Sequence, residues 1–160
     1  MQKITACLWF DNKAEEAAKF YTSIFKKSKI KGTTRYGKAG AKASGRPEGT
    51  VMTVLFELDG QEFLGLNGGP HFKFSPAISF IANCKDQAEI DTLWRKLSAG
   101  GEPGQCGWLT DKFGVSWQIV PANFAKMLLA KDSKKPERVM EAVLQMKKID
   151  LKKVQKAYDA

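Results

Sequence analysis

The single histidine of the chain stands in a glycine- and proline-rich connection. His71 lies in GGPHFKFSP, between two apolar segments. An imidazole in such a connection suits a general base, or a hydrogen-bond donor at the mouth of a pocket. The alternative is a loop histidine whose ring bonds only to backbone. His71 is therefore the candidate catalytic residue.

Polar and aromatic side chains alternate along the apolar segments. In VSWQIV, Ser116 and Gln118 share one face of a strand and Trp117 takes the other. Trp108 follows Gly107, which permits a close approach by a ligand or by backbone. The alternative is that all the tryptophans belong to the core. The predicted ligand-binding side chains are Trp9, Glu62, Leu64, Asn67, His71, Trp108, Ser116 and Gln118.

The glycine- and lysine-rich segment 37–49, GKAGAKASGRPEG, predicts a flexible surface loop. It contains no GxxxxGK[ST] phosphate-binding pattern. The alternative is a loop that folds over a pocket and meets an anionic ligand with Arg35, Lys38, Lys42 or Arg46. The chain also carries no nucleophile elbow, catalytic-triad spacing or dinucleotide fingerprint.

The composition limits the partners and the location. The net charge is +9, but the lysines are spread and accompany no nucleic-acid-binding motif, which predicts a solvated basic surface and no nucleic acid partner. No apolar run approaches the roughly 20 residues of a membrane span, and the first residues do not resemble a secretory signal. Three widely spaced cysteines without a CxxC pattern predict a reduced, cytoplasmic protein.

The chemistry depends on two similar halves of the chain. The first half predicts a strand over 4–10, an amphipathic helix that begins at Asn12 with Glu15 in a capping box, a strand over 29–37, and two strands joined by Asp59-Gly60. The second half predicts a strand over 77–84, a helix that begins at Asp86, and the hairpin of CGWLTD and VSWQIV.

These halves indicate an internal duplication. Ala17, Phe20, Tyr21 and Ile24 have the spacing of Ile90, Leu93, Trp94 and Leu97, an offset of 73 positions, and the order of elements repeats. We expect an α+β fold of two βαβββ modules that form a curled mixed sheet with a concave pocket, plus C-terminal helices. The prediction is one domain over 1–160, with halves 1–68 and 76–121 and a helical extension 122–160. The extension is expected to cover either the sheet or a partner subunit with an apolar stripe that includes Val139, Val143, Met146 and Val154.

Four segments resemble one known family. ITACLWFDNKAEEAAKFYTSIF, NGGPHFKFSPAISFIANC, CGWLTDKFGVSWQIVP and LQMKKIDLKKVQKAY are similar to PhnB-like proteins, a branch of the vicinal-oxygen-chelate (glyoxalase/bleomycin-resistance/dioxygenase) superfamily. This branch is often labelled a 3-demethylubiquinone-9 3-methyltransferase domain. The resemblance covers nearly the whole chain and implies the fold described above and a homodimer.

The resemblance also implies where a divalent metal would be held. The four ligand positions of the superfamily fall at Thr5, near Leu64, at Ala77 or Ile78, and at Gln118. Only Gln118 carries a ligand atom, and Glu62 on the same strand face as Leu64 adds at most one more, so we predict no metal site and no cofactor.

We therefore expect a small-molecule-binding domain without the usual metal site. The first alternative is a metal-dependent lyase, isomerase or dioxygenase that uses Gln118, Glu62 and His71. The second is methyl transfer, as the family label suggests. An S-adenosylmethionine enzyme normally has a glycine-rich loop after a first parallel strand, and the sequence shows no such loop.

Overall fold

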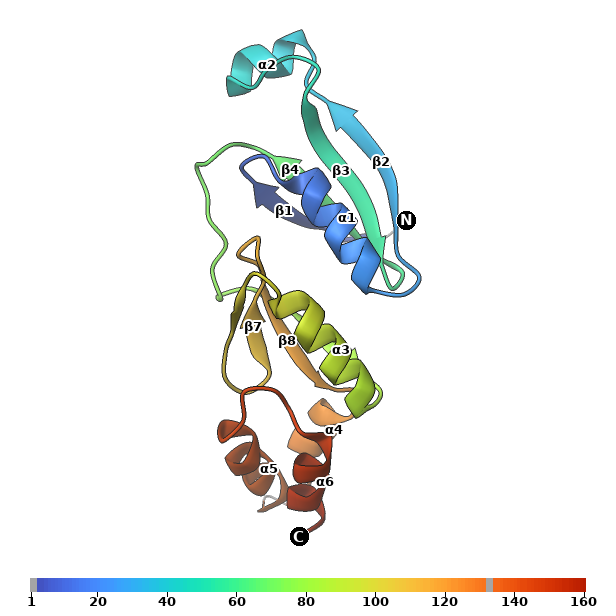
Figure 1. Cartoon of the computed structure of the whole chain (residues 1–160), viewed down its shortest axis with the longest axis vertical. Helices are drawn as coiled ribbons and strands as arrows, with labels where there is room; N and C mark the ends of the chain where they lie inside the picture. Colours follow the sequence, from blue (N-terminus) through green and yellow to red (C-terminus); the bar gives the residue numbers. More distant parts are fainter. Residues whose placement is uncertain (1–2, 132–133) are drawn as a thin grey trace. The chain divides into compact units, whose positions relative to one another are not determined.

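The computed structural model describes residues 3–131 and 134–160 and divides the chain into two compact units, 1–74 and 75–160 (Figure 1). The division falls inside GGPHFKFSP, the segment predicted to separate the halves. We describe each unit by itself, as the N-terminal unit and the C-terminal unit.

The N-terminal unit is one βαβββ module with an added helix. Its four-stranded sheet has the order β1-β4-β3-β2, in which β1 and β4 are parallel and the other pairs are antiparallel. Asp59 and Gly60 both have positive φ in the turn between β3 and β4, as the predicted hairpin requires. The elements are β1 (Ala6–Phe10), α1 (Ala14–Ile24), β2 (Lys29–Arg35), α2 (Lys38–Ser44), β3 (Val51–Leu58) and β4 (Gln61–Asn67).

Helix α1 covers one face of this sheet (Figure 1). It buries Ala14, Ala17, Ala18 and Tyr21, and the Tyr21 ring stacks on Phe56 of β3 at 6.2 Å between centroids. Small alanine side chains let the helix approach the strands closely. A Cβ added at Gly65 of β4 would lie 3.1 Å from the Cβ of Ala14, so the core of this unit depends on small residues on both sides.

The segment 37–49 is not the flexible loop that its glycine content predicts. Residues 38–44 form α2, and Gly45 ends the helix in the left-handed conformation with a φ of 71°. Alanine and lysine are strong helix formers, and the helix forms even though Gly40 lies within it. Gly37 and Gly45 occupy its two cap positions. The prediction was wrong because composition outweighed local helix propensity.

The C-terminal unit repeats the topology of the N-terminal unit. Its sheet has the order β5-β8-β7-β6, with β5 and β8 parallel and the other pairs antiparallel, and α3 covers one face. The elements are β5 (Ser79–Cys84), α3 (Gln87–Ser98), β6 (Glu102–Pro103), β7 (Trp108–Thr110) and β8 (Ser116–Pro121). The predicted α+β class with two βαβββ modules is thus confirmed, as two separate four-stranded sheets.

The duplication holds for the topology but not for the predicted residue match. At an offset of 73 positions the fully buried Tyr21 corresponds to the half-buried Trp94, whereas Leu93 points into the core. The strands also begin later than predicted, at Ala6 and Ser79. The proposed ligand positions Thr5, Ala77 and Ile78 therefore precede the strands and are exposed.

The β7–β8 hairpin closes around a buried carboxylate. Asp111 is 2% exposed, and its Oδ1 accepts hydrogen bonds from the backbone N–H groups of Phe113 (2.8 Å) and Val115 (3.1 Å). Its Oδ2 accepts the indole N–H of Trp117 at 2.9 Å. Trp117 is buried on the helix side of β8, as the alternation predicts.

The C-terminal helices pack on their own unit. The helices bury Val139, Val143 and Val154, and the connection between α5 and α6 buries Met146, as predicted. The carbonyls of Met146 and Lys147 accept hydrogen bonds from the backbone N–H groups of Cys106 and Gly107 at 2.7 Å each. Gln87 accepts from the backbone N–H of Leu151 at 2.8 Å. The extension thus braces the turn that precedes β7. Its helices are α4 (Phe124–Leu128), α5 (Lys134–Leu144) and α6 (Leu151–Asp159).

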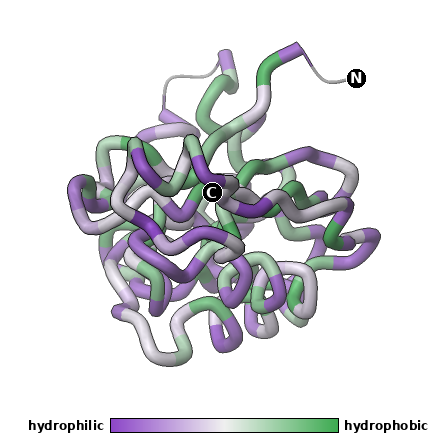
Figure 2. Tube along the Cα trace, turned by 90° about the horizontal axis from the view of Figure 1, so that it is seen from above, coloured by the Kyte–Doolittle hydropathy of each residue, from purple (hydrophilic) through white to green (hydrophobic). Residues whose placement is uncertain are grey.

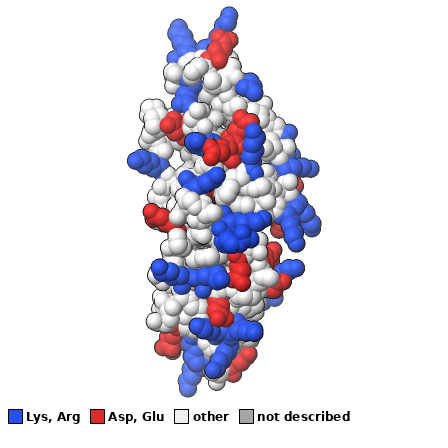
Figure 3. Space-filling model, in the orientation of Figure 1, with Lys and Arg blue, Asp and Glu red and all other residues white. Residues whose placement is uncertain are grey.

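The surface carries both signs of charge. On the face shown in Figure 3, Lys and Arg are spread over both units, with Asp and Glu among them, rather than gathered in one patch. Hydrophobic and hydrophilic residues alternate over short stretches of the trace (Figure 2). In the described part of the chain, every helix is too short or too polar to cross a membrane.

Candidate functional site

The helix-free face of the N-terminal sheet, opposite α1, carries side chains of three kinds. Cross-strand register sorts them into rows, because directly opposed residues project from the same face. Most of these side chains are half-buried. The aromatic and hydroxyl row is Trp9, Leu66, Thr53 and Thr34, the apolar row is Cys7, Leu64 and Leu55, and the charged row is Glu62 and Glu57 with Lys31.

Trp9 is the most tightly held member of the first row. Its indole N–H donates to the carbonyl of Gly69 at 2.8 Å, and its ring meets Phe72 edge-on at 4.9 Å between centroids. A Cβ added at Gly68 would lie 2.2 Å from the Trp9 ring, so only glycine permits this approach. The backbone of Gly68 and Gly69 thus packs directly against the indole of Trp9.

The charged row is paired within itself. The ammonium of Lys31 donates to Glu62 and lies 3.9 Å from Glu57. The hydrogen bond to Glu62, together with the negative charges of Glu62 and Glu57, raises the pKa of Lys31. Glu62 therefore forms an ion pair with Lys31, which makes its carboxylate a poor metal ligand.

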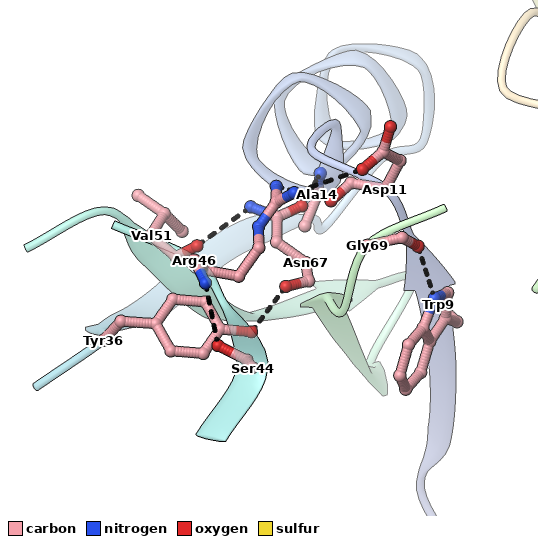
Figure 4. Close-up of polar contacts among 9 residues, drawn as sticks. All are labelled: Trp9, Asp11, Ala14, Tyr36, Ser44, Arg46, Val51, Asn67 and Gly69. Atoms are coloured by element: carbon pink, nitrogen blue, oxygen red, sulfur yellow. Dashed lines mark hydrogen bonds and ion pairs between the residues drawn. The ribbon is translucent and has the colours of Figure 1, made fainter. Parts of the chain in front are cut away.

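Asn67 faces the opposite way and ties the module together. Its Oδ1 accepts the backbone N–H of Ala14 at 2.8 Å, and its Nδ2 donates to the carbonyl of Val51 at 3.1 Å (Figure 4). The carbonyl of Asn67 accepts the hydroxyl of Tyr36 at 2.6 Å. Asn67 thus caps α1 from β4. The predicted cap at Asn12 was wrong, because the helix begins at Ala14 and Lys13 takes the N-cap position. The Lys13 side chain makes no capping hydrogen bond.

The helix-free face of the C-terminal sheet has corresponding rows with different side chains. Ser116 and Gln118 share it, as the alternation predicts, and Trp108 lies opposite Gln118 on the same face. Gln118 Nε2 donates to Ser79 Oγ at 2.9 Å. One row is Ile81, Gln118 and Trp108, and the next is Ser79, Ser116, Thr110 and Glu102.

The residues at the proposed metal positions do not fit a divalent cation. Leu64 is paired in register with Cys7 and Leu55, and Gln118 offers one neutral amide oxygen. A divalent ion needs several charged or imidazole ligands. Within residues 3–131 and 134–160, no group of three His, Cys, Asp or Glu side chains is arranged to hold a metal.

The structure groups some of the predicted site residues and separates others. Trp9, Glu62 and Leu64 share the N-terminal helix-free face, while Asn67 serves the helix side. His71 is exposed in a turn, with its ring 3.5 Å from the position of a Cβ on Gly69. Cys7, Leu55, Leu66 and Thr53 share this face with Trp9 and Leu64 and were not among the predicted residues, although strand alternation places them there.

A separate groove of about 390 Å³ lies in the C-terminal unit, between the ends of β5 and β8 and helix α6. Lys85, Asn123, Lys152 and Gln155 supply its polar lining. None of the predicted site residues lines it.

Known proteins are similar to this chain in sequence and in fold. The sequence model described as 3-demethylubiquinone-9 3-methyltransferase matches residues 2–120. A solved PhnB protein from Bacillus cereus, named a candidate 3-demethylubiquinone-9 3-methyltransferase, is 42% identical, with a TM-score of 0.65, over 74% of this chain and 99% of that one. A protein from Pseudomonas aeruginosa shares the fold at 19% identity and a TM-score of 0.60, over 76% of this chain and 98% of its own. Among curated proteins there is no significant match.

The family match stops before the C-terminal helices. The segment LQMKKIDLKKVQKAY, whose resemblance the sequence suggested, lies beyond residue 120 and outside the match. The Bacillus cereus protein likewise has no counterpart for about a quarter of this chain, since the alignment spans 74% of it.

Proposed function

Because the chain belongs to the PhnB-like family described as 3-demethylubiquinone-9 3-methyltransferase, we propose that it is a small-molecule-binding domain that works without the superfamily's usual metal. The apolar row of the N-terminal sheet supports this proposal most strongly. Cys7, Leu64 and Leu55 lie between an aromatic row and a charged row. Apolar walls with a few convergent polar groups are typical of ligand sites. The expected ligand has an apolar body and a polar or charged end.

The test is a fluorescence titration with 1-anilinonaphthalene-8-sulfonate, which has an apolar body and one anionic group. We expect L64N to weaken binding about tenfold, because one leucine contact contributes roughly 1.4 kcal/mol. L144N is the matched control, since Leu144 is 57% exposed and belongs to α5 of the C-terminal unit. Equal weakening by both substitutions, or no change in L64N, contradicts the proposal.

The metal-dependent alternative has a direct test. We expect elemental analysis of protein purified without chelators to find far less than one metal ion per chain, because Leu64 and Gln118 stand where charged or imidazole ligands are needed. A stoichiometric metal that is lost in Q118A would overturn the metal-free proposal and favour the metal-dependent alternative.

Methyl transfer from S-adenosylmethionine is not what we expect, despite the family description. Each described sheet combines one parallel pair with two antiparallel pairs, whereas sites for nucleotide-type cofactors usually follow consecutive parallel strands. Calorimetry with S-adenosylmethionine is expected to give no binding heat.

A homodimer and a cytoplasmic location complete the proposal. Leu129, Met140 and Leu144 are exposed on the C-terminal helices and offer apolar surface to a second copy. The free thiols Cys7, Cys84 and Cys106 suit a reducing compartment. Light scattering that gives a monomer mass at micromolar concentration would contradict the dimer.

A further inference from the structure

We propose that Arg46 is a positioning residue for Trp9. By clamping Asp11, it holds the Gly68–Gly69 turn that receives the indole on the helix-free face. The inference deepens the proposed function, because it concerns the same face, but its test needs no ligand.

The clamp joins the segment that follows α2 to the loop between β1 and α1. Nη2 of Arg46 donates to the carbonyl of Asp11 at 2.7 Å, and Nη1 donates to Asp11 Oδ1 at 3.2 Å (Figure 4). The Arg46 side chain is only 21% exposed, although α2 itself buries no residue. A planar guanidinium meets both oxygens at once, which a lysine ammonium cannot reproduce with the same geometry.

The same Asp11 carbonyl continues the path towards the tryptophan. It also accepts the backbone N–H of Gly69 at 3.3 Å, and Gly68 N–H donates to the carbonyl of Phe10 at 2.9 Å. Gly69 in turn accepts the indole N–H of Trp9 at 2.8 Å. A continuous chain of hydrogen bonds therefore runs from Arg46 through Asp11 and Gly69 to Trp9.

The turn has little freedom to hold Trp9 in another way. Gly69 has a φ of 97°, and a Cβ at Gly68 would overlap the Trp9 ring. The backbone of the turn must therefore lie directly against the indole. A shift of the Asp11 carbonyl changes the position of the Gly69 peptide, and with it the acceptor that fixes the indole.

A second arginine, at the start of the segment between β2 and β3 that contains α2, provides a matched control. Arg35 Nη1 donates to the carbonyl of Gly49 at 2.9 Å. This bond links the two ends of the segment and does not involve Asp11. Tyr36 holds the same segment independently, because its hydroxyl donates to the carbonyl of Asn67. Loss of the Arg46 clamp is therefore expected to release the turn without unfolding α2 or the sheet.

The experiment is 19F NMR of protein labelled with 5-fluorotryptophan, whose four resonances are assigned with W9F, W94F, W108F and W117F. We expect R46Q to shift and broaden the Trp9 resonance and to leave the other three in place. R46K is expected to restore the resonance partly, and D11A to produce a smaller shift. R35Q is expected to change nothing.

Three outcomes would overturn the proposal. They are an unmoved Trp9 resonance in R46Q, an equal shift in R35Q, and a movement of all four resonances in R46Q, which would mean a general loss of structure. Failure here leaves the weakening of probe binding by L64N unaffected, so the two proposals fail separately.

Discussion

The two sheets share one topology, yet their helix-free faces carry different chemistry. Where the N-terminal sheet places the apolar Cys7, Leu64 and Leu55, the C-terminal sheet places Ile81, Gln118 and Trp108. The neighbouring row holds the charged Glu62, Glu57 and Lys31 in the first unit. In the second unit it holds Ser79, Ser116 and Thr110, with Glu102 as its one charged member. The duplicated backbone fixes which positions face away from the helix, and the side chains at those positions have diverged.

The units also differ in how their helices and hairpins are secured. Helix α1 is capped from β4 by Asn67, whereas α3 is capped locally by Asp86, whose Oδ1 accepts the N–H of Glu89 at 2.9 Å. The N-terminal hairpin closes with a two-residue turn, and the C-terminal one closes around Asp111. The same fold is therefore secured by a long-range cap in the N-terminal unit and by local hydrogen bonds in the C-terminal unit.

Substitution of the two hairpin aspartates is the strongest way to test this difference. D111A leaves two buried donors and one partly buried donor without their acceptor, so we expect a loss of roughly 3–4 kcal/mol in the free energy of unfolding. D59A only places alanine at positive φ, at a cost of about 1 kcal/mol. Urea unfolding followed by tryptophan fluorescence measures both, and similar losses would show that the Asp111 network is not what stabilises the hairpin.

The helix caps give a smaller contrast. N67A removes the acceptor for Ala14 N–H and the donor to Val51, with an expected loss of about 2 kcal/mol. D86A removes one local cap, which contributes about 1 kcal/mol. N67D keeps an acceptor at the helix start and is expected to recover part of the loss. A larger effect of D86A in urea unfolding would reverse the comparison.

The thiol reactivity of Cys7, on a helix-free face, can be compared with that of Cys84, on the helix side of its sheet. Burial, with smaller effects of the Glu89 and Asp86 charges, raises the pKa of the Cys84 thiol to about 12. Partial desolvation of its sulfur also raises the pKa of Cys7, although the residue as a whole is exposed. A raised pKa lowers the thiolate fraction, and alkylation quickens as the pH rises towards the pKa. At pH 8 we expect iodoacetamide to modify Cys7 more slowly than free cysteine and to leave Cys84 unmodified. Mass spectrometry of wild type and C7S checks this, and equal rates at both thiols would contradict it.

Periodicity and turn chemistry predicted the order of the elements except for α2 and the short β6. The strands around Asp59-Gly60, the cap at Asp86 and the faces of Ser116, Gln118 and Trp117 all depend on neighbours within a few residues. Such local signals survive in a single sequence. Segment 37–49 was misjudged for the opposite reason, because its glycines suggested flexibility where alanine and lysine favour α2.

The long-range polar bonds were out of reach of the sequence. Asn67 caps a helix that begins 53 positions earlier, Arg46 meets Asp11 across 35 positions, and Trp9 bonds to Gly69 across 60. No periodic pattern links residues at such separations. Asp111 resembled an ordinary turn residue, and only its burial in the structure reveals the three hydrogen bonds that it accepts.

The most direct test maps a bound ligand on methyl groups. Protein with labelled leucine methyls is titrated with 1-anilinonaphthalene-8-sulfonate, and the shifted resonances are assigned by single substitutions. We predict that Leu55, Leu64 and Leu66 shift together while Leu129 and Leu144 do not. Shifts confined to the C-terminal helices, or shifts at Leu64 that appear only after a divalent metal is added, would contradict a metal-independent site on the N-terminal sheet.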